Sequence, residues 1–145
     1  MRSISNPQRQ HKISQNRHNI MIRNFPESFL EIEITKDSIK KYVGKPIIYH
    51  HIENDYSHLV SGILDDVSDD QIFVEKPSMV VTEHADTDDY DENIHDYQSW
   101  ISVGDDYTKD SGNPPLLFKH IKYLHVSKED ISLEEMQNTF LNYFK

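Results

Sequence analysis

Histidine is the residue type that gives this sequence most of its potential chemistry, with nine copies in 145 residues. A neutral imidazole coordinates transition metals, and its proton exchanges near neutral pH. Two sets of histidines and carboxylates are close enough along the chain to converge: His51, Asp55 and His58, and His84, Asp86, His95 and Asp96. Neither set has the spacing of a known metal motif, so the sequence predicts solvent-facing histidines, no metal site and no cofactor.

Histidines also suggest acid–base catalysis. Two of the residues His51, His120 and His125 could act as general base and general acid, as in a ribonuclease, while Lys119 binds the phosphate. Alternation along an expected strand would place His120 on the face opposite Lys119 and Ile121. The four glycines lie in no nucleophile or phosphate-loop motif, and the chain has no cysteine. The sequence therefore predicts a non-catalytic protein, with a small hydrolase or nuclease using histidines as an alternative.

The charge of the chain is strongly negative and unevenly distributed. The formal net charge is −10. Residues 1–23 carry five basic residues and no acidic one, whereas residues 65–110 carry fifteen acidic residues and two basic ones. The negative field of the chain would repel a polyanion such as nucleic acid and would attract a cationic protein. The charge therefore favours a basic protein partner over nucleic acid.

Residues 83–97 form the densest acidic stretch, which we interpret as an insertion in the fold. Like charges this close repel one another and favour an extended, solvated loop. Aromatic residues among the acids could anchor a partner. The expected partner-binding residues are Asp86, Asp88, Asp89, Tyr90, Asp91, Glu92, Tyr97 and Trp100. Two alternatives are that the insertion only aids solubility and that Trp100 and some tyrosines belong to the core.

The elements that must position these residues are mainly short strands. Residues 1–24 lack periodicity and are expected to be a flexible basic arm, and residues 25–145 a single domain. Leu30, Ile32 and Ile34 alternate as in a half-buried strand, and a short helix is expected over residues 38–43, ended by Gly44. Further strands are expected at residues 47–52, 59–67, 71–74, 79–82, 98–103 and 116–126. Inside the second of these, Gly62 indicates a bulge or a close backbone approach.

A C-terminal amphipathic helix is expected over residues 132–144. Ser132 and Glu135 have the spacing of a capping box. An apolar stripe of helical period follows, formed by Leu133, Met136, Phe140 and Phe144. The stripe is expected to pack against the sheet, and docking of another subunit is the alternative. We therefore expect a mainly β fold with flanking helices, built on a small, strongly bent antiparallel β-barrel.

Residues 39–74 followed by 118–126 resemble the Sm-like fold, and an SH3-like barrel would give nearly the same pattern. The segment 43–47 resembles the join between the helix and the first strand, and the segment 61–67 resembles the second strand with its bending glycine. Phe118-Lys119-His120-Ile121 is similar to a signature of bacterial Sm-like RNA chaperones. The resemblance implies a helix that caps a five-stranded barrel, and an RNA-binding oligomer. Nucleic-acid contacts would then come from Lys40, Lys41, Lys45, Lys119 and His120.

The leading hypothesis is a cytoplasmic, non-catalytic interaction module that presents an acidic surface to a basic protein of the inhibitor, immunity or adaptor type. No apolar run is long enough for a membrane span or a signal peptide, so no membrane contact is expected. Self-association through the C-terminal helix or open strand edges is a further expectation. An Sm-like RNA-binding oligomer is the main alternative.

Overall fold

The computed structural model describes residues 25–54, 56–82 and 97–144. Its elements are listed here in chain order: β1 (Phe29–Ile32), α2 (Lys36–Ile39), η1 (Lys40–Tyr42), β2 (Pro46–Glu53), β3 (Tyr56–Val67), β4 (Gln71–Thr82), β5 (Tyr97–Ser102), β6 (Leu116–Leu117), η2 (Phe118–His120), β7 (Ile121–Ser127) and α3 (Leu133–Tyr143). The basic arm expected at residues 1–24 and most of the acidic insertion fall outside the described residues. None of the helices in the described ranges is long and apolar enough to cross a membrane.

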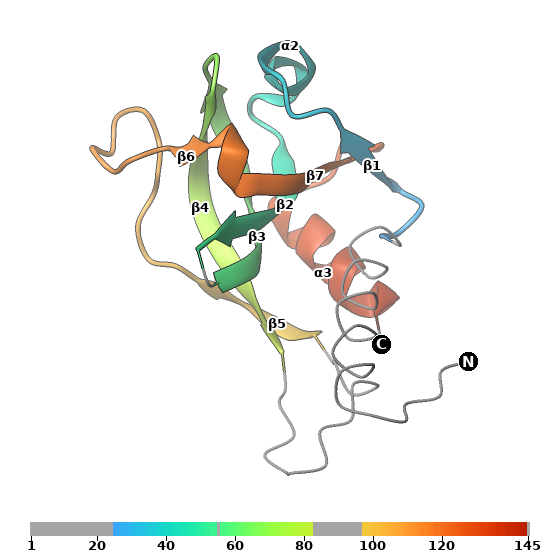
Figure 1. Cartoon of the computed structure of the whole chain (residues 1–145). Helices are drawn as coiled ribbons and strands as arrows, with labels where there is room; N and C mark the ends of the chain where they lie inside the picture. The colour runs from blue at the N-terminus through green and yellow to red at the C-terminus, as the bar shows by residue number, and fades with distance from the viewer. Residues whose placement is uncertain (1–24, 55, 83–96, 145) are drawn as a thin grey trace, which may run out of the picture.

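All strands belong to one antiparallel sheet in the order β1-β7-β2-β3-β4-β5, and the two residues of β6 pair with the start of β4 (Figure 1). The prediction of a mainly β, antiparallel fold with flanking helices is confirmed. Within the described residues the sheet bends but does not close into a barrel, and its edge strands are β1 and β5.

Strands β3 and β4 approach each other closely at Gly62. A Cβ atom at Gly62 would collide with the Cγ1 atom of Val74 and crowd the carbonyl oxygen of Glu75. The close approach expected at Gly62 is therefore confirmed. The pairing register shifts beside this glycine, and Lys76 adopts a positive φ of 53° just before Pro77. Residues 71–74 and 79–82, predicted as two strands, are consequently the two ends of the single bent strand β4.

The strand predicted over residues 116–126 is two strands, β6 and β7, and the prediction is wrong for residues 118–120 between them. The 3-10 turn η2 consists of Phe118, Lys119 and His120. The backbone amide of Phe118 donates to the carbonyl of Asp70, just before β4, at 2.8 Å. This turn breaks the two-residue period of a strand. The predicted alternation of His120 with its neighbours therefore does not apply.

Two hydrophobic clusters cover the two faces of the sheet. The inner cluster, on the side of α2 and η2, consists of Ile39, Ile47, Tyr49, Val60, Leu64, Val67, Ile72, Val74, Ile121, Leu124 and Val126. The outer cluster, on the side of α3, consists of Phe25, Phe29, Ile48, Leu59, Met136 and Phe140. Neighbouring residues of one strand enter different clusters, because side chains alternate across a sheet.

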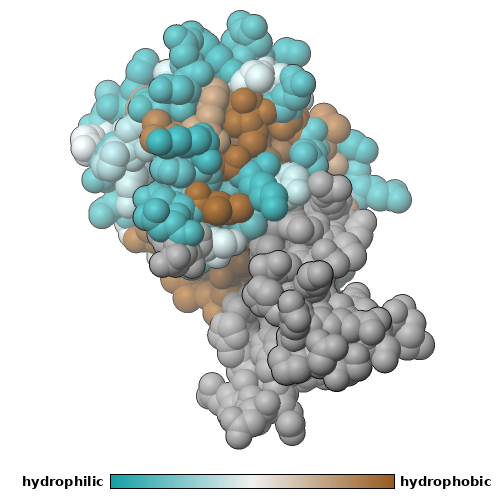
Figure 2. All heavy atoms as spheres, viewed as in Figure 1, coloured by the Kyte–Doolittle hydropathy of each residue, from teal (hydrophilic) through white to brown (hydrophobic). Residues whose placement is uncertain are grey.

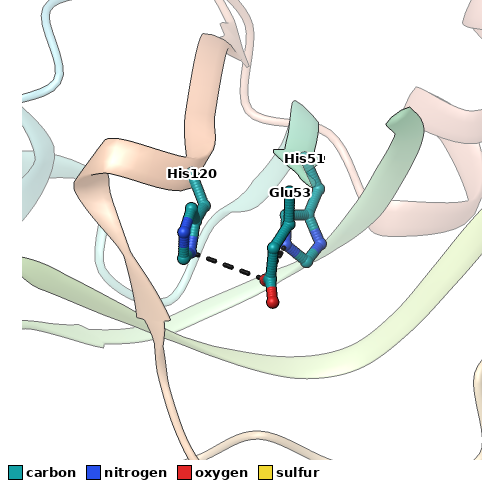
Figure 3. A group of neighbouring side chains, drawn as sticks. All are labelled: His51, Glu53 and His120. Atoms are coloured by element: carbon teal, nitrogen blue, oxygen red, sulfur yellow. Dashed lines mark hydrogen bonds and ion pairs between the residues drawn. The ribbon is translucent and has the colours of Figure 1, made fainter. Parts of the chain in front are cut away.

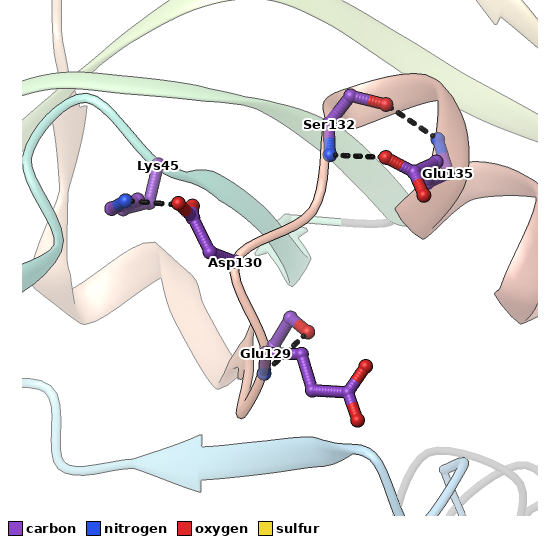
Figure 4. Close-up of polar contacts among 6 residues, drawn as sticks. Lys45, Glu129, Asp130, Ser132 and Glu135 are labelled. Atoms are coloured by element: carbon purple, nitrogen blue, oxygen red, sulfur yellow. Dashed lines mark hydrogen bonds and ion pairs between the residues drawn. The ribbon is translucent and has the colours of Figure 1, made fainter.

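Helix α3 confirms the capping box and the apolar stripe. The Ser132 hydroxyl accepts from the Glu135 amide, and the Glu135 carboxylate accepts from the Ser132 amide, each at 3.1 Å (Figure 4). Met136 and Phe140 are completely buried against the outer face. This part of the stripe therefore packs within the chain, as expected.

A short helix forms where one was expected over residues 38–43, but it begins at Lys36 and continues from Lys40 to Tyr42 as the 3-10 turn η1. Thr35 is its N-cap, and its hydroxyl accepts from the Ser38 amide at 3.2 Å. Gly44 ends the helical segment with a φ of 90°. Ile39 is fully buried in the inner cluster, whereas Val43 is exposed. Helix α2 and turn η1 thus cover the inner face at the end where β2 begins (Figure 1).

Candidate functional site

A cavity of about 540 Å³ opens on the inner face, beside the last residues of β2. Its walls come from three neighbouring strands, β2, β3 and β4, and from the connection between β5 and η2. Most of the lining is apolar, and examples are Val60, Ile72, Met79, Val103 and Leu116. Hydrophobic side chains also reach the surface in patches set among hydrophilic ones (Figure 2). A cavity of this size and lining is typical of a ligand-binding site.

The polar part of the cavity is a cluster of His51, Glu53 and His120. The Oε1 atom of Glu53 lies 3.2 Å from Nε2 of His51 and 3.5 Å from Nδ1 of His120. The two imidazole centroids are 6.2 Å apart. Figure 3 shows the carboxylate between the two rings, which come from different elements. All three side chains are half-buried, so the cluster is open to a ligand.

The local fold explains why these three side chains meet. His51 and Glu53 are two residues apart on β2, so they point to the same face. In the pairing of β2 with β7, Ile121 lies opposite His51, which brings the last residue of η2 to the same place. His58 also lines the cavity, because it is the register partner of His51 on β3.

Tyr49 forms part of the floor of the cavity. Burial, and to a smaller extent the neighbouring Tyr107, raise the pKa of the Tyr49 hydroxyl well above its ordinary value of 10. The hydroxyl therefore stays protonated throughout the physiological range. Among the described residues that line the cavity, Glu53 is the only acidic one, and none is a lysine or an arginine.

Of the histidines considered as a catalytic pair, His51 and His120 converge and His125 does not. His125 lies on the outer face, where its ring stacks on Phe25. Asp55 lies outside the described residues. Sequence reasoning missed Glu53, which follows directly after the strand expected at residues 47–52. Its two-residue spacing from His51 was the signal that could have identified it.

The five residues expected to contact nucleic acid do not lie together in the structure. Lys40 pairs with Asp37 at 3.1 Å, and Lys45 pairs with Asp130 at 2.8 Å (Figure 4). Lys41 and Lys45 line a separate, smaller hollow, whereas His120 lines the cavity. Lys119 is exposed on η2. These side chains therefore form no single basic stripe within the described residues.

The expected partner-binding residues of the insertion, from Asp86 to Glu92, fall outside the described residues. Tyr97 begins β5. Trp100 packs against the outer cluster, and its indole nitrogen donates to the carbonyl of Gln137 in α3 at 3.1 Å. Trp100 is thus engaged within the chain, as the alternative interpretation expected.

A second acidic surface lies within the described residues. We call it the acidic rim, and it consists of Asp65, Asp66, Asp105, Asp106 and Asp110. The backbone amide of Lys109 donates to Asp65 at 3.0 Å, and its ammonium group pairs with Asp66 at 2.8 Å. This hydrogen-bonded ammonium group lowers the pKa of Asp66. Because Val103 and Tyr107 flank the rim residues Asp105 and Asp106 and line the cavity, the rim borders the cavity.

Strand β5 leaves one edge of the sheet open beside the cavity. In the described part of the chain it pairs with β4 alone. Ile101 is 56% exposed and Val103, just after the strand, is 42% exposed. On the opposite edge, Leu30 of β1 is also 42% exposed, but it does not line the cavity.

The chain matches no protein-family model, no curated protein and no solved structure. The cavity, the histidine–glutamate cluster, the open edge and the acidic rim are therefore the features that can indicate its function.

Proposed function

We propose that the protein is a non-catalytic interaction domain that binds an extended, basic segment of a partner protein along the edge of β5. The observation that carries this proposal is the exposure of Ile101 and Val103 on an open strand edge that borders both an apolar cavity and the acidic rim.

An open strand edge offers unpaired backbone groups to another chain. An extended peptide that adds to such an edge gains backbone hydrogen bonds, and its alternate side chains enter pockets that give specificity. Val103 lines the cavity and follows β5 directly. A peptide on this edge would therefore place one apolar side chain over or into the cavity.

Charge favours a basic sequence for the peptide. The chain carries a net charge of −10, and the acidic rim continues from the end of β5. A negative field of this kind accelerates the approach of cationic partners and disfavours anionic ones. Lysine or arginine side chains that alternate with the apolar side chains of the peptide would face the carboxylates of the rim.

The fold class fits the same proposal. The strand order β7-β2-β3-β4-β5, with a short helix before β2 and a 3-10 turn before β7, supports an Sm-like or SH3-like relationship for the central sheet. RNA binding has less support, because Lys40 and Lys45 are engaged by carboxylates of the chain and the net charge is negative.

The test uses a fluorescent peptide in which lysine alternates with leucine, and a matched peptide in which glutamate replaces lysine. Fluorescence anisotropy with the full chain should show binding of the basic peptide that weakens with salt, and about tenfold weaker binding of the acidic peptide. Equal affinity for the two peptides would contradict the proposal. Tight, salt-dependent binding of polyuridine without peptide binding would favour the RNA-binding alternative.

Two matched variants locate the binding edge. Ile101→Lys adds a positive charge and removes an apolar side chain at β5, so it should weaken binding of the basic peptide by about tenfold. Leu30→Lys makes the same change on β1, at the other edge, and should leave the affinity unchanged. If the two variants weaken binding equally, or if neither does, the β5 edge is not the binding surface.

A further inference from the structure

We infer that His51, Glu53 and His120 form a binding site for a divalent transition metal, with zinc as the best fit. The inference does not rest on the proposed peptide binding, because it is argued from these three side chains and not from the strand edge. It contrasts with the expectation from the sequence, which predicted no metal site.

The separations between the three candidate ligand atoms suit tetrahedral coordination. Zinc binds imidazole nitrogen and carboxylate oxygen at about 2.0–2.2 Å, so two ligands at a tetrahedral angle lie about 3.3–3.6 Å apart. The Glu53 oxygen lies 3.2 Å from the His51 nitrogen and 3.5 Å from the His120 nitrogen. All three atoms lie within 4.8 Å of one another, so a small approach of the two rings would complete the geometry.

The donor set indicates which metals would bind. Two imidazoles and one carboxylate suit zinc and its neighbours in the first transition row, whereas magnesium and calcium prefer oxygen ligands. Three protein ligands leave one position of a tetrahedral ion open. All three residues line the cavity, so a water molecule or a donor atom of a bound ligand could fill that position.

The backbone holds the three ligands in place. His51 and Glu53 lie on β2, which is paired on both sides by β3 and β7. His120 follows Phe118, whose amide is bonded to Asp70, and precedes Ile121, which pairs with His51. Binding would therefore need little ordering of the backbone, and the negative charge of the chain would raise the local concentration of cations.

The experiment is calorimetric titration of the full chain, freed of metal with a chelator, with zinc chloride. We expect one tight zinc ion per chain, and weakening by about tenfold or more in each of His51→Ala, Glu53→Gln and His120→Ala. Cobalt should bind at the same site and give the visible absorption bands of a tetrahedral ion, whereas magnesium should not compete. A chain that binds no zinc stoichiometrically would overturn the inference.

A control variant separates this site from the other histidines. The double variant His84→Ala/His95→Ala removes the histidines of the acidic insertion, which the sequence offered as an alternative metal-binding set. We expect it to retain the tight zinc ion, and loss of that ion would overturn the inference. Glu53→Gln preserves the size of the side chain, and circular dichroism confirms whether each variant is folded. Binding retained in a folded triple variant His51→Ala/Glu53→Gln/His120→Ala would also overturn it.

The result of the zinc titration can be distinguished from the result of the peptide-binding test. Ile101→Lys lies outside the cavity lining and should bind zinc as the unmodified chain does. Failure of zinc binding would leave the peptide-binding results unaffected, and failure of peptide binding would leave the zinc titration unaffected.

Discussion

The imidazole of His125 lies parallel to the ring of Phe25, with centroids 4.0 Å apart and planes inclined by 10°. His125 is only 3% exposed, and its buried Nδ1 atom has no hydrogen-bond partner among the described residues. Phe25, from the first described segment, thus covers a histidine of β7 on the outer face. Burial lowers the pKa of His125 from 6.5 to about 4.

This burial predicts that the fold loses stability in mild acid. Between pH 6.5 and about 4 the unfolded chain protonates at His125 and the folded chain does not, so the free energy of unfolding falls as the pH falls. The shift corresponds to a loss of about 3 kcal/mol from this residue. Urea unfolding at several pH values across this window measures the loss.

His125→Phe is the matched variant for the pH prediction. It keeps an aromatic ring beside Phe25 and removes the titrating group, so its stability should depend less steeply on pH over the same window. Glu31, the register partner of His125 on β1, is exposed and remains in both proteins. Identical pH dependence of the two proteins would show that His125 is not the responsible group.

Gly62→Ala should destabilise the fold, because the added methyl group would collide with Val74 and approach the Glu75 carbonyl. Overpacking of this kind typically costs about 1–3 kcal/mol. Urea unfolding measures the loss. The double variant Gly62→Ala/Val74→Ala removes one of the colliding groups and should be more stable than the sum of the two single effects predicts. Strict additivity would mean that the contact between β3 and β4 does not limit this position.

Ser132→Ala should destabilise α3 by about 1 kcal/mol, because the helix loses its N-cap. The hydroxyl of Ser132 accepts from the amide of Glu135, which lies in the first turn of α3. Ser132→Asp is the control, since aspartate caps helices about as well as serine. A thermal melt should show a lower midpoint for the alanine variant alone, and equal midpoints for the two variants would count against the capping role.

Local patterns predicted much of the fold. The end of the first helix at Gly44, the β-branched run of β2 and the Ser132 capping box depend on neighbours within a few residues, so they are visible in the sequence. The continuity of β4 through Lys76 was not visible. It depends on pairing with β3 and β5 across a backbone irregularity, and a proline normally indicates a break.

The sequence revealed only part of the candidate site, because the rest depends on contacts between distant segments. The sequence indicated His51 and His120 as reactive residues but could not bring them together, because their proximity depends on the pairing of β2 with β7. It misplaced His120 on a strand, and the strand expected at residues 47–52 stopped one residue short of Glu53. The cavity has no local signature either, because its walls come from segments far apart in the chain.

The cavity and the strand edge should contribute separately to peptide binding. Val103 lines the cavity, whereas Ile101, two residues earlier on the same edge, does not. Both are exposed, so tryptophan at either position should leave the core intact. Val103→Trp should fill the mouth of the cavity and weaken binding of the basic peptide by about tenfold. Ile101→Trp keeps an apolar surface on the edge and should retain the affinity. Anisotropy titration compares the two variants, and equal affinities would show that no peptide side chain enters the cavity.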